Sequence, residues 1–146
     1  MADYRRGAHT FHDIKLHVVW TTKYRHPILL GEIGLTAREF IRQICQARDV
    51  VIVKGSLKPD HVHLMVEIPP GLSVSDLMQA IKGKSARLLF RDFPALRRRY
   101  WGQHLWSRGY FAASVGCVDE ALILDYIAHQ DKPRDEGFTV DGAQGL

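Results

Sequence analysis

Two histidines separated by one residue are the feature of the sequence best suited to chemistry. His61 and His63 lie in a segment, residues 61–68, in which apolar residues occupy every second position. This alternation predicts a strand with one face in the core, and it places both histidines on the opposite, exposed face together with Met65 and Glu67. Side chains two residues apart are about 6 to 7 Å apart along a strand, so one divalent ion could lie between the two imidazoles.

The histidine pair does not define a metal site by itself. A closed structural zinc site would need two further cysteine or histidine ligands nearby, and the sequence offers none at a suitable spacing. An open site would need one more protein ligand and would leave positions for a substrate oxygen. Pairs of exposed histidines also occur on surfaces that bind no metal, so both interpretations stay open at this point.

A tyrosine and a glutamine near the C-terminus offer a third ligand and a nucleophile. Tyr126 and Gln130 are four residues apart and would share one face of a helix. The glutamine amide oxygen is a suitable ligand, and a phenol one turn away could reach whatever the ion binds. A tyrosine packed at a helix edge beside a solvated glutamine would give the same pattern. Tyr100 with His104 is a rival pair, but Gly102 between them disfavours a helix there.

The elements that must position these residues follow from periodicity and turn signals. Strands are predicted at residues 14–22, 50–57, 61–68 and 110–115, and helices at 36–47 or from an earlier start, at 73–90 and from 119 onward. The turn at 58–60 joins the second and third strands as a hairpin. The order βαββαβ predicts an α+β, ferredoxin-like fold: a four-stranded antiparallel sheet with both helices on one face, followed by a C-terminal helix that carries Tyr126.

Length and composition limit the class of protein. With 146 residues, 46% hydrophobic and 25% charged, the chain has the size and composition of one globular domain, residues 1–146, with about ten loose residues at each end. No apolar run approaches the ~18 residues that a membrane span needs, and no signal peptide is evident. We expect a cytoplasmic protein with two reduced cysteines and no membrane partner.

Basic charge is concentrated in the middle of the chain. Between Lys82 and Arg108 there are eight basic residues and one acidic residue, a net charge of +7. The same stretch holds five aromatic residues: Phe90, Phe93, Tyr100, Trp101 and Trp106. Cations that pair with phosphates and rings that stack on bases suit single-stranded nucleic acid. A solvated helix face followed by buried aromatics would have the same composition.

These segments together resemble a known family. The His-hydrophobic-His motif resembles that of the HUH single-strand nucleases, and the chain more closely resembles the single-tyrosine transposases of small insertion sequences, the TnpA type. The matching segments run in the family's order from about residue 12 to 132: they are residues 20–27, 59–66, 73–87 with Lys82-Gly83-Lys84-Ser85, 105–111 and 126–130.

The resemblance implies an activity and a set of site residues. It implies a metal-dependent enzyme that binds single-stranded DNA with a subterminal hairpin, cuts it through a 5′-phosphotyrosine and later rejoins strands. Tyr126 would be the nucleophile, and His61, His63 and Gln130 would hold Mg²⁺ or Mn²⁺. It also implies a homodimer whose active sites are shared between subunits. The residues expected to contact DNA are Lys82, Lys84, Ser85, Arg87, Lys23 and Arg25.

Three other functions remain as alternatives. A domesticated relative of the same family would cleave hairpins of a repeated chromosomal sequence, often as a monomer. A ferredoxin-like nucleic-acid-binding module without chemistry would have no use for Tyr126 and Gln130 on one helix face. A two-histidine metallohydrolase would release its product through water, whereas a tyrosine transposase forms a covalent protein–DNA adduct.

Overall fold

The computed structural model describes residues 5–6 and 11–115. Its elements in chain order are β1 (Arg5–Arg6), β2 (Phe11–His12), β3 (Lys15–Thr21), the 3₁₀ turn η1 (Lys23–Arg25), α1 (Gly31–Gln46), β4 (Val51–Leu57), β5 (His61–Glu67), α2 (Val74–Asp92), α3 (Pro94–Arg99) and β6 (Phe111–Ser114). The predicted helix with Tyr126 and Gln130 lies outside the described residues.

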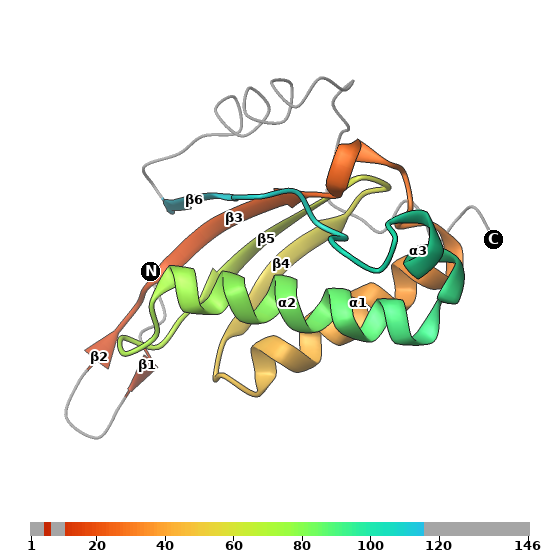
Figure 1. The fold of residues 1–146 in the computed structure, drawn as a ribbon. Coiled ribbons are helices and arrows are strands. Elements are labelled where there is room, and N and C mark those ends of the chain that lie inside the picture. The colour runs from red at the N-terminus through yellow and green to blue at the C-terminus, as the bar shows by residue number, and fades with distance from the viewer. Residues whose placement is uncertain (1–4, 7–10, 116–146) are drawn as a thin grey trace.

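Four strands form an antiparallel sheet in the order β4-β5-β3-β6. Helices α1 and α2 lie side by side on one face of this sheet (Figure 1). The predicted α+β fold with a four-stranded antiparallel sheet is therefore confirmed. The strand with the two histidines, β5, is internal, between β4 and β3, so its side chains have neighbours on both sides.

The strand periodicity correctly separates the two faces of the sheet. Leu16, Val18 and Trp20 of β3 pair with Val66, Leu64 and Val62 of β5, and all six side chains are buried in the core. The residues between them in sequence therefore point to the opposite face, because side chains alternate along a strand. That opposite face holds both histidines of the motif.

One helix is missing from the sequence prediction, and another takes the earlier start that the prediction allowed. Helix α1 begins at Gly31, five residues before residue 36. Gly31 has a φ of 52°, which suits glycine and lets the chain turn into the helix earlier. Helix α3 was not predicted, and Pro94 stands at its first position. Helix α2 follows Ser73, whose side chain accepts from the amide of Asp76 at 3.1 Å.

The segment after α3 returns across the end of the sheet. Trp106 forms an isolated antiparallel bridge with Thr22. The Lys23 amide donates to the Leu105 carbonyl at 2.8 Å, and the Ser107 amide donates to the Thr21 carbonyl at 2.9 Å. These bonds fix residues 105–107 beside the end of β3 and the turn η1. None of the helices in the described part of the chain is long and apolar enough to cross a membrane.

Two glycines give a matched test of this packing. A Cβ at Gly55 would lie 2.5 Å from Leu64 Cδ2 and 3.2 Å from the His63 carbonyl oxygen, whereas a Cβ at Gly83 of α2 would meet nothing within 4 Å. We expect Gly55→Ala to lower the free energy of unfolding by about 1–3 kcal/mol through overpacking. Gly83→Ala should raise it by about 0.5–1 kcal/mol, because alanine favours a helix. Urea denaturation measures both, and equal effects of the two changes would contradict the register of β4 on β5.

Candidate functional site

The two histidines of the motif are buried on the face of the sheet opposite the helices. His61 is 3% exposed and His63 is 4% exposed. His61 pairs with Thr21 of β3, and His63 lies between Val19 of β3 and Ser56 of β4. The prediction that these side chains point away from the helices is correct, but the prediction that they are exposed is wrong. Alternation along a strand predicts which face a side chain takes and not what packs against that face.

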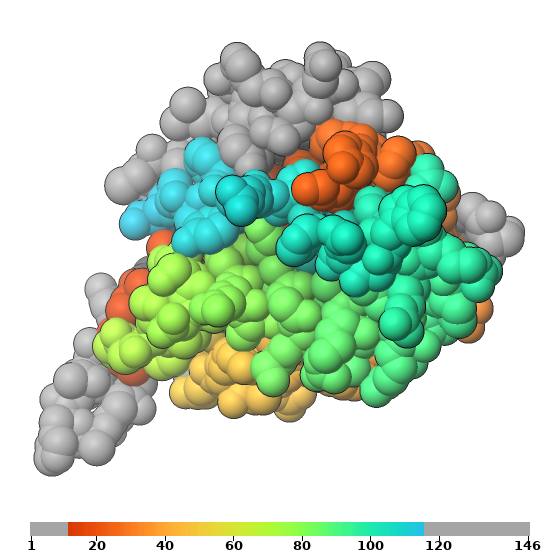
Figure 2. All heavy atoms as spheres, viewed as in Figure 1, coloured from red at the N-terminus to blue at the C-terminus, as the bar shows by residue number. Residues whose placement is uncertain are grey.

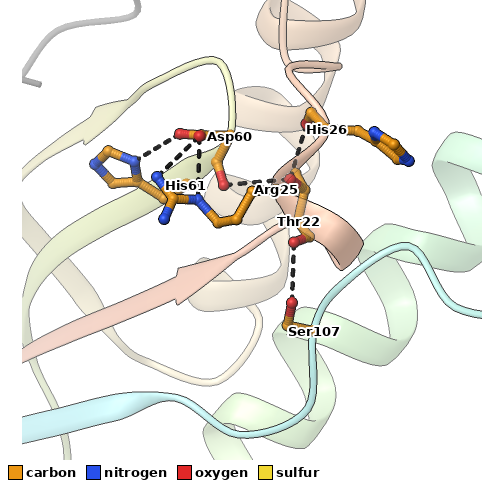
Figure 3. A network of polar contacts seen from close by, with 6 residues as sticks. All are labelled: Thr22, Arg25, His26, Asp60, His61 and Ser107. Atoms are coloured by element: carbon orange, nitrogen blue, oxygen red, sulfur yellow. Dashed lines mark hydrogen bonds and ion pairs between the residues drawn. The ribbon is translucent and has the colours of Figure 1, made fainter. Parts of the chain in front are cut away.

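His61 is oriented by a buried ion pair. Its Nδ1 lies 3.0 Å from Oδ1 of Asp60. Oδ2 of Asp60 accepts from Arg25 Nε at 3.1 Å and pairs with Nη2 at 2.9 Å. Figure 3 shows Asp60 between the His61 ring and the Arg25 guanidinium. A histidine that a carboxylate orients through Nδ1 presents Nε2 to a metal, a common arrangement around metal-binding histidines.

The charge of Asp60 is maintained by these contacts. Burial acts to raise the pKa of Asp60, but the hydrogen bond with His61 and the Arg25 guanidinium together lower it below its ordinary value. Asp60 is therefore ionised at neutral pH. An ionised carboxylate beside Nδ1 makes His61 a stronger donor through its other nitrogen.

His63 has a second histidine as its neighbour. His17 Nδ1 lies 3.1 Å from His63 Nε2, and the ring centroids are 5.3 Å apart. Burial, together with the charges of His17, His61 and Lys54, lowers the pKa of His63 to about 4. His63 is therefore neutral at pH 7, which is the state that binds a metal.

His17 was absent from the predicted site. Its pKa is also lowered, by burial first and then by the charge of Lys54. The sequence does hold a signal for it, because the alternation of residues 14–22 puts His17 on the polar face. On an antiparallel neighbour this position is diagonal to His63, within reach of a ring.

The described residues supply only part of a metal site. Within residues 5–6 and 11–115, no group of three or more His, Cys, Asp or Glu side chains is arranged to hold a metal ion. The candidate donors among the described residues are the imidazoles of His61 and His63, and a metal there would need a further ligand. The predicted third ligand, Gln130, and the predicted nucleophile, Tyr126, lie outside the described residues.

The rival nucleophile Tyr100 has a structural role. Its ring is buried, and its hydroxyl donates to the carbonyl of Lys23 at 3.3 Å. Burial raises the pKa of Tyr100 to about 12, in spite of the nearby Arg99. A phenol with a raised pKa is a weaker nucleophile at neutral pH. These observations disfavour Tyr100 and leave Tyr126 as the candidate.

Three of the predicted DNA contacts are engaged with the protein itself. Arg25 is buried in the ion pair with Asp60. Ser85 is fully buried and accepts a hydrogen bond from Trp106 Nε1 at 3.0 Å. Lys82 Nζ donates to the carbonyls of Ser107 and Gly109 at 2.8 and 2.7 Å. Arg25 thus joins η1 to the start of β5, whereas Lys82 and Ser85 join α2 to the returning segment.

The other predicted contacts lie at the surface. Lys84 and Arg87 are exposed on α2, and Lys23 is half-buried in η1. Arg87 also lines a cavity of about 840 Å³ between α2 and residues 102–109, with the cations Lys82, Arg91, Arg97 and Arg108 and the rings of Phe90 and Trp106. Figure 2 shows α2 in green beside the returning segment in teal. This surface is basic and partly aromatic, which suits an anionic polymer with bases.

A four-stranded antiparallel sheet with a buried histidine pair on an inner strand defines a small α+β protein with a candidate metal site. Residues 10–130 match the family model described as "Transposase IS200 like". The transposase for insertion sequence element IS200 of Salmonella typhimurium is 38% identical over 130 residues, covering 89% of this chain and 85% of that protein. The ISDra2 transposase TnpA of Deinococcus radiodurans is 32% identical over 126 residues, covering 86% and 90%.

Solved structures agree with the sequence relatives. A crystal structure from Deinococcus radiodurans R1, described as that of a candidate transposase, superposes with a TM-score of 0.78 at 32% identity and covers 86% of this chain and 97% of that chain. The REP-associated tyrosine transposase bound to a REP hairpin has a TM-score of 0.53 at 18% identity, covering 90% and 69%, and supports the fold alone. The chain belongs to the IS200-like transposase family, whose activity is the cutting and transfer of DNA strands.

The buried ion pair at the site gives a matched test against an exposed one. Asp60→Ala leaves the Arg25 guanidinium buried without its carboxylate, so we expect a loss of about 3–5 kcal/mol in the free energy of unfolding. Asp92→Ala breaks the Arg91–Asp92 pair at the surface, where solvent screens it, and should leave the unfolding midpoint almost unchanged. Denaturant unfolding of the two variants measures the difference.

The same ion pair predicts a pH dependence. Because the pKa of Asp60 is lowered in the folded state, its contribution is complete above its ordinary pKa and is lost as the pH falls through the lowered value. The stability gap between the wild-type chain and Asp60→Ala should therefore shrink in acid. A gap that is independent of pH would contradict the ion pair.

Proposed function

We propose that this transposase cuts and rejoins single-stranded DNA at hairpin ends through a 5′-phosphotyrosine on Tyr126. A divalent ion held by His61, His63 and Gln130 would assist it. The observation that carries the proposal is the histidine pair itself: two buried imidazoles on one strand, His61 oriented by an ionised carboxylate and His63 neutral at pH 7. A structural histidine pair would need neither the arginine nor the buried aspartate behind it.

The donor set fits a divalent ion with open positions. Two imidazole nitrogens and one amide oxygen leave positions for phosphate oxygens. Imidazole is a softer donor than the oxygen ligands that Mg²⁺ prefers, so of the two expected ions the set suits Mn²⁺ better. When bound, such an ion would withdraw charge from the scissile phosphate and favour the ionised phenol.

The chemistry assigned to Tyr126 conserves one phosphodiester bond at each step. The phenolic oxygen forms a bond to phosphorus while the bond from phosphorus to the 3′ oxygen breaks. The phenol loses its proton, and the departing 3′ oxygen gains one. A 3′-hydroxyl attacking the phosphotyrosine reverses the exchange and joins strands without ATP. A free phenol has a pKa near 10, so the site must favour its anion.

The alternatives are less well supported. The domesticated hairpin nuclease finds a counterpart in the REP-associated transposase, but at 18% identity this likeness concerns the fold alone. The insertion-sequence relative is 38% identical over most of both chains. A binding module without chemistry would not need a buried charge network behind His61. The insertion-sequence transposase is therefore the function that the geometry and the relatives favour.

The tyrosine assignment is tested by removing one hydroxyl at a time. We expect Tyr126→Phe to abolish both cleavage and the covalent adduct, while DNA affinity stays near that of the wild-type chain, because only the attacking oxygen is lost. Tyr100→Phe keeps the buried ring and should still form the adduct. Denaturing gels of protein incubated with hairpin DNA and Mn²⁺ show the adduct as a slower band. An adduct retained by Tyr126→Phe, or lost in Tyr100→Phe, would contradict the assignment of the nucleophile to Tyr126.

We propose Lys84, Arg87 and Lys23 as the phosphate contacts among the predicted residues, because their charges are at or near the surface. Lys84→Ala should weaken binding to single-stranded DNA and lower the slope of log K against log salt by about 0.7. Arg42→Ala removes an exposed cation from α1 and should leave the slope unchanged. Fluorescence anisotropy across a salt series measures both. Equal slopes for Lys84→Ala and the wild-type chain would show that this lysine contacts no phosphate.

The proposal includes a homodimer in which each site takes His61 and His63 from one chain and Tyr126 and Gln130 from its partner. Mixing the inactive variants Tyr126→Phe and His63→Ala should then restore cleavage. About half of the exchanged dimers would be mixed, each with one intact site, giving roughly a quarter of wild-type sites. With chains tagged to different sizes, the adduct should form only on the His63→Ala chain. Failure to rescue after verified subunit exchange would place the site within one chain.

A further inference from the structure

The ring of Tyr24 lies at the surface, in the turn η1 between β3 and α1. Tyr24 is 73% exposed. Lys23 Nζ lies 5.4 Å from the centroid of its ring, and the His26 ring meets it edge-on at 5.7 Å. A single exposed ring is ordinary on a protein surface, so it is the backbone and the surroundings of Tyr24 that point to a function.

The backbone at Tyr24 is held in an unfavourable conformation. Tyr24 has a φ of 60° and Arg25 a φ of 55°, in the left-handed region that disfavours residues with a side chain. Two hydrogen bonds fix the turn. The Arg25 amide donates to the Thr22 carbonyl at 3.0 Å, and Thr22 Oγ1 donates to the His26 carbonyl at 2.8 Å. A strained, well-held backbone at an exposed side chain points to a function for that side chain.

The ion pair with Asp60 explains how the ring is displayed. Arg25 turns inward to the buried carboxylate, and the residue before it is thereby exposed at the surface. The other oxygen of Asp60 contacts His61, so one aspartate connects the Tyr24 turn to the candidate metal site. The two are therefore neighbours in space.

The ring is backed by a row of further rings. The His26 ring lies 5.7 Å from that of Tyr100, and Tyr100 lies 6.4 Å from Phe90, which packs against the core. The hydroxyl of Tyr100 is bonded to the carbonyl of Lys23. Contacts along this row restrict the Tyr24 side chain, so less conformational entropy is lost when a partner binds to it.

Charge around the ring favours a nucleic acid as its partner. Lys23 contributes one cation, and Arg97, Arg98 and Arg99 form the last turn of α3 directly before Tyr100. Alternating cations and rings are the pattern that binds single strands, where a ring stacks on a base and the cations contact phosphates. Bases inside a hairpin stem are already stacked on one another, so the fitting partner is an unpaired base.

We propose that Tyr24 is a stacking site for an unpaired base of the single-stranded DNA beside the cleavage site. This rests on the proposed function for its substrate class, and it adds a binding residue to that function. In this arrangement the Arg25–Asp60 pair has two roles. It orients His61, and it presents Tyr24 to the DNA strand near the candidate metal site.

The test uses glycine, which removes the ring and relieves the backbone. We expect Tyr24→Gly to keep or raise the melting temperature, because glycine accepts the positive φ. It should nevertheless weaken binding to a fluorescent oligothymidylate about tenfold, the loss expected for one stacked base. Tyr24→Trp should bind within about threefold of the wild-type chain, because it retains a stacking ring.

Asp49→Gly is the matched control. Asp49 is exposed and has a φ of 59° just after α1. A glycine there relieves the same backbone strain as at Tyr24 but removes no ring. We expect this variant to bind the oligothymidylate as the wild-type chain does. Tyr24→Gly should also leave the salt slope unchanged, because no charge is lost, whereas Lys23→Ala should lower the slope by about 0.7.

Wild-type affinity in Tyr24→Gly would overturn the proposal, and so would an equal loss of affinity in Asp49→Gly. A loss that Tyr24→Trp does not recover would also contradict stacking. These measurements need no cleavage, so they are separate from the test of Tyr126. Absence of an adduct would overturn the phosphotyrosine chemistry while leaving the effect of Tyr24 on affinity to be measured.

Discussion

The buried contact between Arg25, Asp60 and His61 is the interaction on which the rest of the site depends. It joins the turn after β3 to the hairpin that begins β5, and two main-chain bonds support the junction: the Thr22 amide to the Asp60 carbonyl and the Leu29 amide to the Pro59 carbonyl, both at 2.9 Å. A buried pair of this kind adds little stability by itself, because desolvation offsets the attraction. Its benefit is orientation, since it leaves the His61 ring few alternative positions.

The sheet supplies the second constraint. An internal strand between two antiparallel neighbours has a fixed register, so His63 lies beside both His17 and His61 without flexible linkers. Burial on this face keeps His63 neutral, which prepares it as a ligand but costs the hydration of its ring. The strained turn at Tyr24 and the buried charges behind His61 are features that stability alone would not favour. Their clustering at one end of the sheet agrees with a functional site.

The sequence allowed the fold and the face of each strand to be predicted, because both depend on local periodicity. The burial of His61 and His63 could not be predicted, since alternation shows which face a side chain takes but not what packs against it. The contacts of Lys82 and Ser85 could not be predicted from the basic motif either, since residues 105–109, distant in sequence, return over α2 and bond to both side chains. Their contact with DNA stays a prediction. The alternation of residues 14–22 indicates the face that His17 takes, but its contact with His63 was not predicted, because that contact depends on the register between two strands. Tyr126 and Gln130 lie outside the described residues and stay predictions.

We propose that His61 and His63 together hold a divalent ion. Pulsed electron paramagnetic resonance of the Mn²⁺-loaded protein tests this proposal, because imidazole nitrogens bound to Mn²⁺ give resolved couplings. We expect couplings from two histidines, reduced to one in His63→Ala and unchanged in His104→Ala, which removes an exposed histidine from the returning segment. Mn²⁺ without nitrogen coupling in the wild-type chain, or couplings that persist when both His61 and His63 are alanine, would contradict it.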